Sequence, residues 1–289
     1  MPKARRDAAP PSASPSTTSR GRAADVALVL EWNDRQVRRV ADSLVAEEPL
    51  ELRIDDFPLT VTMRTPGHDL ELAAGFLFTE GLIQDRSQIV DLRYGMGVEG
   101  APSGNIVQIK TDGVPIDRER MQRNFFVASS CGICGKASID AVRARGLKQP
   151  NPDLRVDPEI LCRLPETLRS AQAVFGVTGG LHAAGLFDVR GNLLVLREDV
   201  GRHNAVDKVA GWALMQDRLP LSDQILMVSG RGGFEIIQKS LVAGIPLVAC
   251  VSAPSSLAVK LARELNLTLV GFLRGKRFVV YSADERLGF

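Results

Sequence analysis

The sequence has 289 residues, of which 45% are hydrophobic, so it can bury a sizeable core as one large domain or two unequal ones. Its formal net charge is +2 with 24% charged residues of both signs, so neither nucleic acid nor a membrane is an expected partner. No run of about 18 apolar residues occurs, and the sequence therefore predicts no transmembrane helix.

The first 24 residues are rich in Pro, Ser, Ala, Thr and Arg, and they are predicted to form a disordered tail because they have almost nothing to bury. They lack the apolar block of a secretory signal, so we expect a soluble cytoplasmic protein. A permanent disulfide is not expected in that reducing compartment. Four cysteines are present, at Cys131, Cys134, Cys162 and Cys250.

Residues 25–120 are predicted to form a small α+β domain. Two strand-like runs, 50–54 and 59–63, flank a turn sequence and indicate a β-hairpin. Thr65-Pro66-Gly67 then precedes a helix whose apolar residues within 70–77 share one face. A polar stretch that contains glycine and proline follows, and it places the domain boundary near residue 120.

Residues 121–289 are predicted to form a larger α/β domain, a mixed sheet flanked by helices. Its parallel part is indicated by apolar runs without alternation, the pattern of strands covered on both faces. Those runs and the helices that connect them are residues 225–228, 234–242, 246–252, 255–265 and 267–272. A hairpin and a helix are predicted before them, at residues 183–187, 193–196 and 204–215.

Cys131 and Cys134 lie between a strand-like run, 124–129, and a short predicted helix, 137–145. A glycine follows each cysteine and removes side-chain bulk beside the sulfur. The helix N-terminus and Lys136 favour thiolate over thiol. These are the conditions for a nucleophilic sulfur that attacks the outer sulfur of a persulfide and carries it to an acceptor.

A Cys-x-x-Cys pair also occurs in structural zinc sites, in deaminase-type zinc sites and in redox proteins. Structural zinc needs a second ligand pair, and Cys162 and Cys250 are isolated residues predicted to lie in the core. A deaminase-type zinc site fails because His182 follows the cysteines, Ala184 takes the place of the glutamate and Ser130 replaces the proline. Thioredoxin-like redox chemistry stays open.

Two charged or glycine-rich turns are candidate anion sites. Ser229-Gly230-Arg231-Gly232-Gly233 joins a strand to a helix, where backbone N–H groups and an arginine can bind phosphate. It matches neither established nucleotide-binding glycine pattern, and a tight turn with a solvated arginine is the alternative. Arg202 and His203 could also contact phosphate, and Glu198 or Asp199 could accept hydrogen bonds from a base or sugar. The alternative there is an ion-paired loop.

A third candidate lies near the C-terminus, where Arg274, Lys276 and Arg277 surround a turn between two strand-like runs. A solvated hairpin tip is the default interpretation. The alternative hypothesis is that the three cations converge on one large anionic ligand. His182 follows another glycine-rich stretch, and a lone histidine there is interpreted as structural.

Together these motifs resemble the FdhD family, the formate dehydrogenase accessory sulfurtransferases. The resemblance extends in order from residue 38 to residue 282. Its segments are Thr65-Pro66-Gly67, Ser129-Ser130-Cys131-Gly132-Ile133-Cys134-Gly135-Lys136, residues 197–207, Ser229-Gly230-Arg231-Gly232-Gly233 and Phe272-Leu273-Arg274-Gly275.

The resemblance implies a sulfurtransferase that takes persulfide sulfur from a cysteine desulfurase. It would pass the sulfur to the molybdenum cofactor, Mo-bis(molybdopterin guanine dinucleotide), which formate dehydrogenase requires for activity. Cys131 matches the persulfide cysteine, with Cys134 as its partner in the loop, and residues 272–277 match the cofactor-binding stretch. The resemblance also implies a larger domain similar to the cytidine deaminase fold, and a homodimer.

Residues and resemblance together predict a dispersed cofactor site, in which a guanine nucleotide is also expected to fit. A cofactor with two pyrophosphates and two guanines needs donors from several turns. The predicted binding residues are Arg202, His203, Gly230, Arg231, Gly232, Gly233, Phe272, Leu273, Arg274, Gly275, Lys276 and Arg277, and no metal ligands are predicted. Two competing functions are a nucleotide-cofactor-binding chaperone and a dithiol oxidoreductase.

Overall fold

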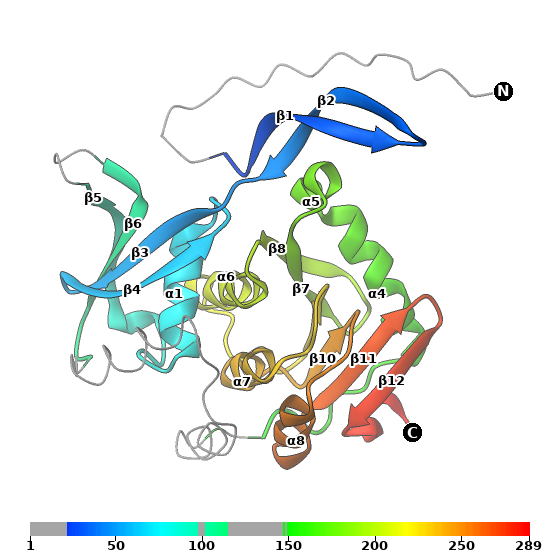
Figure 1. The fold of residues 1–289 in the computed structure, drawn as a ribbon. Helices are drawn as coiled ribbons and strands as arrows, with labels where there is room; N and C mark the ends of the chain where they lie inside the picture. Colours follow the sequence, from blue (N-terminus) through cyan, green and yellow to red (C-terminus); the bar gives the residue numbers. More distant parts are fainter. Residues whose placement is uncertain (1–21, 98–101, 115–146, 148) are drawn as a thin grey trace.

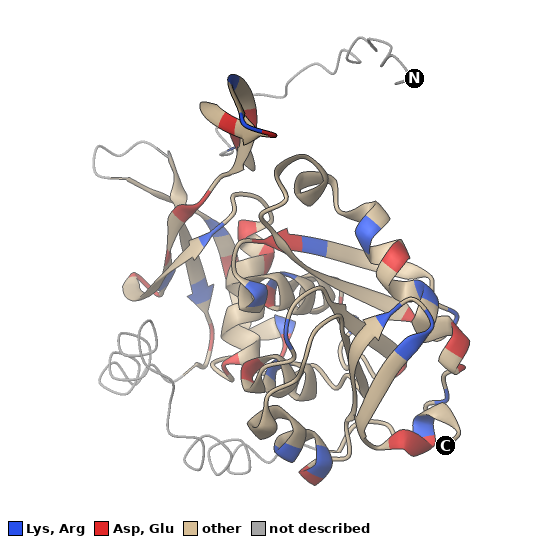
Figure 2. Ribbon diagram, turned by 45° about the vertical axis from the view of Figure 1, so that its right-hand side comes forward, with Lys and Arg blue, Asp and Glu red and all other residues tan. Residues whose placement is uncertain are grey.

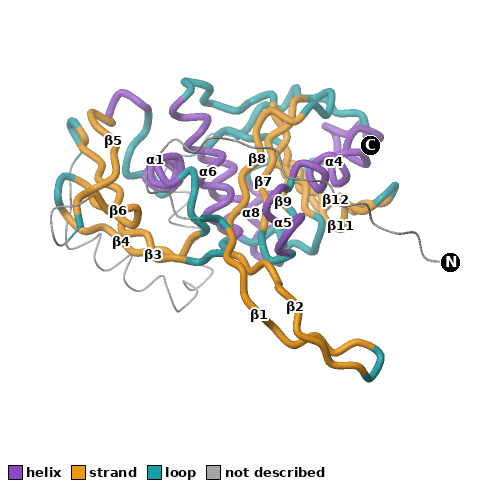
Figure 3. The backbone as a smooth tube through the Cα atoms, turned by 90° about the horizontal axis from the view of Figure 1, so that it is seen from above, coloured by secondary structure: helices purple, strands orange, loops and turns teal. Residues whose placement is uncertain are grey.

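The structure is a computed structural model that describes residues 22–97, 102–114, 147 and 149–289. Within these ranges the strands form three sheets, with helices packed between and around them (Figure 1). The first sheet is a ribbon of β1 (Ala24–Asn33) and β2 (Gln36–Val45), paired antiparallel and projecting from the rest of the molecule (Figure 3). Large apolar side chains alternate along one side of β1 and are 67% to 76% exposed: Val26, Leu28, Leu30 and Trp32.

The second sheet has four strands in the order β4-β3-β6-β5, where β3 and β6 are parallel and the other pairs are antiparallel. The strands are β3 (Glu48–Ile54), β4 (Phe57–Arg64), β5 (Ile89–Met96) and β6 (Pro102–Thr111). Helix α1 (Asp69–Thr79) packs on one face, where alternate strand residues such as Leu50 and Leu52 are fully buried. The predicted hairpin and helix are confirmed.

The third sheet is mixed, with six strands in the order β12-β11-β10-β9-β7-β8. They are β7 (His182–Asp188), β8 (Leu193–Asp199), β9 (Gln224–Val228), β10 (Leu247–Cys250), β11 (Thr268–Arg274) and β12 (Arg277–Ser282). The central strands β9, β10 and β11 are parallel, and the outer strands are antiparallel to their neighbours. The predicted mixed α/β sheet is therefore confirmed.

Helices cover both faces of this sheet, which explains why its central strands are apolar without alternation. On one face Leu226 and Val228 belong to a core that includes α6 (Arg202–Met215), α7 (Phe234–Val242) and α8 (Ser256–Glu264). On the other face Ile225 and Met227 belong to a smaller core with α4 (Pro158–Ala171). The sequence interpretation missed α4, although Asp157 caps it and Pro158 occupies its first turn.

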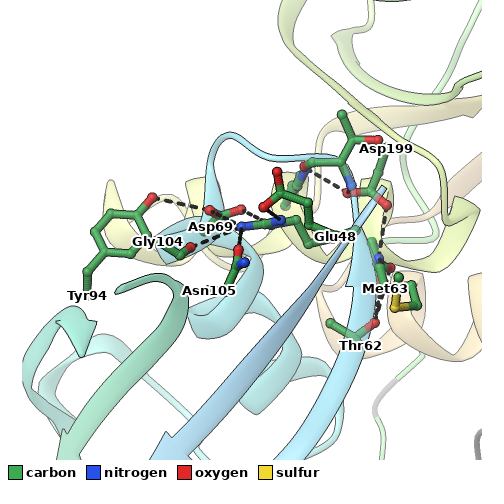
Figure 4. A network of polar contacts seen from close by, with 12 residues as sticks. Glu48, Thr62, Met63, Asp69, Tyr94, Gly104, Asn105 and Asp199 are labelled. Atoms are coloured by element: carbon green, nitrogen blue, oxygen red, sulfur yellow. Dashed lines mark hydrogen bonds and ion pairs between the residues drawn. The ribbon is translucent and has the colours of Figure 1, made fainter. Parts of the chain in front are cut away.

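The four-stranded and six-stranded sheets share the larger hydrophobic core, because α1 lies against α6. Polar contacts also join the four-stranded and six-stranded sheets with their helices. Arg197 Nη2 donates to Glu71 Oε1 at 2.7 Å, and the fully buried Asp199 accepts from the Thr65 backbone N–H at 3.2 Å. Figure 4 shows this carboxylate beside a second network, in which Asp69 lies near Tyr94 and Asn105.

Several sequence predictions concern residues that the structure does not describe: most of the 1–24 tail, the domain boundary near residue 120, the strand-like run 124–129, the short helix 137–145 and the cysteine loop between them. Positions of Lys and Arg and positions of Asp and Glu are both distributed over the described elements (Figure 2). No helix in the described part of the chain is long and apolar enough to cross a membrane.

Candidate functional site

One edge of the six-stranded sheet gathers several of the turns predicted to bind an anion. The parallel strands β9, β10 and β11 end at this edge, where ligands bind in open α/β sheets. His182, the first residue of β7, pairs with Asp199, the last residue of β8, so the turn that leads into α6 reaches the same edge. A bridge between Gly232 and Pro254 joins the loops after β9 and β10.

The glycine loop after β9 lies tightly over this edge. A Cβ atom on Gly232 would stand 2.8 Å from the Cys250 Sγ, closer than Cβ atoms approach other heavy atoms. A Cβ atom on Gly230 would stand 3.2 Å from the His182 Nδ1. Glycine at position 232 therefore lets the backbone come close to β10 and leaves no side chain over the sheet end.

Arg202 and Arg231 supply positive charge to the edge. The Arg202 Cδ would stand 3.9 Å from a Cβ on Gly230, the same position that lies 3.2 Å from the His182 Nδ1. The charges of Arg202 and Arg231 both lower the pKa of His182. The Arg202 Nε is buried and has no hydrogen-bond partner among the described residues. Helices α6 and α7 both start here, after Gly201 and Gly233, and neither has a side-chain cap. Two arginines and two uncapped helix N-termini are the donors that a phosphate group prefers.

The two histidines at the edge are neutral near pH 7. Burial lowers the pKa of His182, and the charges of Arg202 and Arg231 lower it further. Burial and the Arg202 charge lower the pKa of His203 to about 4. His203 was predicted as a phosphate contact. Its neutral ring lies 3.7 Å from the Glu235 carboxylate and can offer a hydrogen bond to a ligand, but no charge.

The β11–β12 hairpin also lies against this edge. The Phe272 N–H donates to the Ser252 carbonyl at 3.3 Å, and the Arg274 Nε donates to the Val251 carbonyl at 3.3 Å. Phe272 has a φ of 53°, a strained left-handed conformation for a bulky residue and a feature found at functional sites. Leu273 is fully buried, so only its backbone can face a ligand.

Gly275, Lys276 and Arg277 form or follow the exposed turn of that hairpin. Gly275 has a φ of 54°, which suits the turn. Arg277 lies directly opposite Arg274 in the strand register, so two like charges sit side by side. An anion between them would relieve their repulsion.

Glu198 and Asp199 do not have the ligand-binding role that the sequence suggested. The Asp199 side chain is fully buried and lies 2.7 Å from the Lys208 Nζ. The Glu198 carboxylate accepts from the backbone N–H groups of Val174 and Phe175, at 3.0 and 2.8 Å. Both carboxylates are occupied because the fold uses them to hold α6 and α5 (Ala173–Thr178), a relation that the local sequence could not reveal.

A cleft of about 460 Å³ adjoins the edge, between α4, α5 and the ends of β7, β9 and β10. Its lining includes Leu168, Gln172, Phe175, His182, Ser229 and Val251. Ser229 belongs to the predicted glycine loop, and His182 was interpreted as structural; the sequence did not predict the other four. A glycine-rich turn before His182 was the available signal, but α4 and α5 were not predicted.

Cys131 and Cys134, the predicted sulfur carriers, lie outside the described residues. Of the other two cysteines, Cys250 is fully buried, as predicted, and burial raises the pKa of its thiol to about 12. Cys162 lies on α4 and is only partly buried. No cluster of three or more potential metal ligands occurs in the described part of the chain.

Comparison with known proteins gives one consistent result. A model of the FdhD/NarQ family matches residues 45–288. A sulfur carrier protein FdhD of Streptomyces avermitilis is 51% identical over 272 residues, which cover 92% of this chain and 96% of the relative. A protein of the same name from Saccharolobus solfataricus is 43% identical over 262 residues, or 88% of this chain and 94% of the relative.

Among solved structures, the fold is similar to that of a putative formate dehydrogenase accessory protein from Desulfotalea psychrophila. The TM-score is 0.71 at 24% sequence identity, with 91% of this chain and 99% of the other covered. At this identity the likeness concerns the fold alone. It extends over both sheets, so the sheet edge belongs to a shared architecture.

Proposed function

This chain belongs to the FdhD/NarQ family, and from that membership we propose that it is a sulfur carrier of formate dehydrogenase maturation. In this proposal Cys131 accepts persulfide sulfur from a cysteine desulfurase. The acceptor is Mo-bis(molybdopterin guanine dinucleotide), held at the edge of the six-stranded sheet. The relatives are named sulfur carriers, which supports the first half of the proposal.

The observation that carries the second half is the convergence of anion donors at that edge. Arg202 lies beside the glycine loop, with its Cδ 3.9 Å from the position of a Cβ on Gly230, and its Nε has no partner among the described residues. Arg231 belongs to the same loop, and both arginine charges lower the pKa of His182. The uncapped starts of α6 and α7 add backbone N–H groups. Such a donor set fits the pyrophosphates of a dinucleotide cofactor, which when bound would supply the molybdenum that receives the sulfur.

Each group has a separate task in binding. Arg202 and Arg231 neutralise phosphate charge, and the close approach of Gly232 keeps the edge open to the ligand. Arg274 donates to the Val251 carbonyl and fixes the β11–β12 hairpin, so that Phe272 presents its exposed ring beside the same edge. The neutral His182 contributes a hydrogen bond without adding charge.

Transfer of sulfur onto the chain requires a thiolate. In the proposed step the Cys131 thiolate attacks the outer sulfur of the desulfurase persulfide, a new S–S bond forms on Cys131, and the desulfurase cysteine leaves as thiolate. Cys250 is not a candidate, because its thiol stays protonated near pH 7.

The test is to load the full chain with labelled sulfur from a cysteine desulfurase and then add the molybdenum cofactor. We expect label on the protein first and on the cofactor afterwards, together with activation of formate dehydrogenase. If the label reaches the protein but never the cofactor, the chain is a persulfide carrier that serves another acceptor. Cofactor binding without any label on the protein would favour the chaperone alternative.

Replacing Arg202 by alanine is expected to weaken binding of inorganic pyrophosphate by about 10- to 100-fold, the range of a charge-assisted hydrogen bond at a partly buried site. Calorimetric titration at fixed salt concentration measures this. Arg218→Ala is the matched control, because Arg218 follows the other end of α6 and its guanidinium stacks on Trp212 at 5.0 Å. Equal pyrophosphate affinity in wild type and Arg202→Ala would contradict the proposed anion site.

The proposal includes a homodimer, supported by the exposed apolar side of the β1–β2 ribbon. An isolated two-stranded ribbon is marginally stable in water, and monomers rarely expose so large an apolar patch. We expect light scattering to give twice the mass of one chain, and Leu28→Asp to give a monomer. Asp42→Lys changes an exposed charge on the opposite side of the ribbon and should remain dimeric. A monomeric wild type would refute this part.

A further inference from the structure

Three helices meet at one buried ammonium group, that of Lys239 on α7. Helices α1, α6 and α7 all contact one another (Figure 1). The Lys239 Nζ donates to the Thr79 Oγ1 at 2.9 Å and to the Glu80 Oε1 at 2.9 Å, at the C-terminal end of α1. It also lies 3.0 Å from the Asp207 Oδ1 of α6. One side chain therefore links all three helices.

The linking group is buried and charged. The side chains of Lys239 and Asp207 are 6% and 3% exposed. Burial disfavours the ammonium form, but the Asp207 and Glu80 carboxylates outweigh it and raise the pKa of Lys239 above its ordinary range. Asp207 is held in turn by the Thr79 hydroxyl, which donates to it at 2.7 Å. Desolvation offsets much of the attraction in a buried ion pair, so net stability is a weak reason for this arrangement.

The link lies close to the two helix starts that contribute to the anion site. Asp207 lies within two turns of the start of α6, and Lys239 lies within two turns of the start of α7. In the first turns of these helices, the His203 Nε2 and the Glu235 Oε2 lie 3.7 Å apart. Burial and the Arg202 charge hold the pKa of His203 at about 4, so this contact is not an ion pair near pH 7. The charged link between α6 and α7 is the Lys239–Asp207 pair.

We infer that Lys239 is a positioning residue of the anion site: through Asp207 and Glu80 it fixes where the starts of α6 and α7 stand relative to each other. The inference rests on the proposed function, because it gives Lys239 a role in the site that would bind phosphate. Arg202 begins α6, and the glycine loop with Arg231 leads into α7. A shift of either start moves one arginine relative to the other, and a hydrogen bond weakens steeply when its geometry changes.

Two variants test positioning separately from charge. Asp207→Leu/Lys239→Met removes both charges of the buried pair and leaves the net charge unchanged. Replacing a whole buried ion pair by apolar residues of similar volume is often neutral for stability. Glu80→Gln removes one negative charge and weakens the link to α1. If charge alone acted on the site, Glu80→Gln would strengthen anion binding, because it removes a repulsive carboxylate.

The measurement is calorimetric titration of the full chain with inorganic pyrophosphate. We expect affinity to fall about tenfold in the double variant and about threefold in Glu80→Gln, as when a group that orients a binding residue is lost. The titrations are run at about pH 8, where the His203 imidazole is neutral even if its pKa returns to the ordinary value of about 6.5. A thermal unfolding scan of each variant reports its stability separately.

Glu51→Gln is the matched control for Glu80→Gln. Glu51 is also a partly buried glutamate in an ion pair, with its Oε1 2.9 Å from the Arg53 Nε. Its side chain is 26% exposed, against 24% for Glu80. Because this pair lies in the four-stranded sheet on β3, Glu51→Gln should leave pyrophosphate affinity unchanged.

The inference is overturned if the folded double variant binds pyrophosphate as the wild type does, or if Glu80→Gln binds it equally or more tightly. If the double variant does not fold, the affinity of Glu80→Gln decides by itself. Arg202→Ala separates these outcomes from failure of the proposed function. A loss of affinity in Arg202→Ala without a loss in the other two variants leaves the anion site and removes the role of Lys239. Wild-type affinity in Arg202→Ala contradicts the anion site, and the inference fails with it.

Discussion

Replacing Cys131 by alanine is expected to abolish sulfur loading. Without the thiol no S–S bond can form at this position, and Cys250 cannot substitute for it, because Cys250 is fully buried and burial raises the pKa of its thiol to about 12. Intact-mass measurement after incubation with a cysteine desulfurase and cysteine checks the result. The wild type should gain the mass of one sulfur atom, and Cys131→Ala should gain none.

Two further variants test whether sulfur loading depends on Cys131 alone. Cys162→Ala removes a partly buried cysteine of α4 and should load as the wild type does. Cys134→Ala should still load, and the lifetime of its persulfide distinguishes two roles. A longer lifetime means that Cys134 resolves the persulfide by forming a disulfide with Cys131, and a shorter one means that it protects or positions it. Full loading of Cys131→Ala would show that another residue carries the sulfur.

Gly211→Ala is expected to destabilise the fold by about 3 kcal/mol or more. In an isolated helix this change would be favourable by roughly 0.5–1 kcal/mol, because alanine is the better helix former. Here α6 crosses α1 so closely that a Cβ on Gly211 would stand 1.8 Å from the Glu71 carbonyl oxygen, and a Cβ on Gly75 would stand 1.8 Å from the Asp207 carbonyl oxygen. The helices must separate, and the core that they share must open.

Urea unfolding, monitored by circular dichroism, measures this loss of stability as a lower urea concentration at the midpoint of unfolding. The matched control is Gly176→Ala in α5, where no heavy atom lies within 4 Å of the added Cβ. That variant should keep the wild-type midpoint or exceed it slightly. A Gly211→Ala protein as stable as wild type would mean that α1 and α6 are farther apart than the structure places them.

The secondary structure of the two sheets could be predicted well from local patterns. The 234–242 helix was predicted with the bounds that α7 has, because its apolar spacing and the preceding glycines are local signals. Helices α4 and α5 were missed, although α4 carries a capping aspartate and a proline in its first turn. The buried leucines of α4 pack on the far face of the sheet, and nothing nearby in sequence indicates that face.

The candidate site was predicted only in part. The glycine loop that contains Arg231 and the turn that contains Arg202 lie at one edge of the sheet, because the carboxyl ends of parallel strands share that edge. That these residues bind a cofactor stays a prediction. The roles of Glu198 and Asp199 were wrong, since both carboxylates are taken up by partners far away along the chain.

The sequence by itself determined the mixed α/β class and the family, because periodicity and short motifs are local properties of the chain, whereas the role of Cys131 stays a prediction. Only the tertiary structure decided which charges remain available to a ligand. Asp199 is neutralised by Lys208, whereas the Arg202 Nε has no partner in the part of the chain that the structure describes and lies beside the glycine loop. Pairing between residues distant in sequence depends on how α1, α5 and α6 pack, and packing is a property of the whole core.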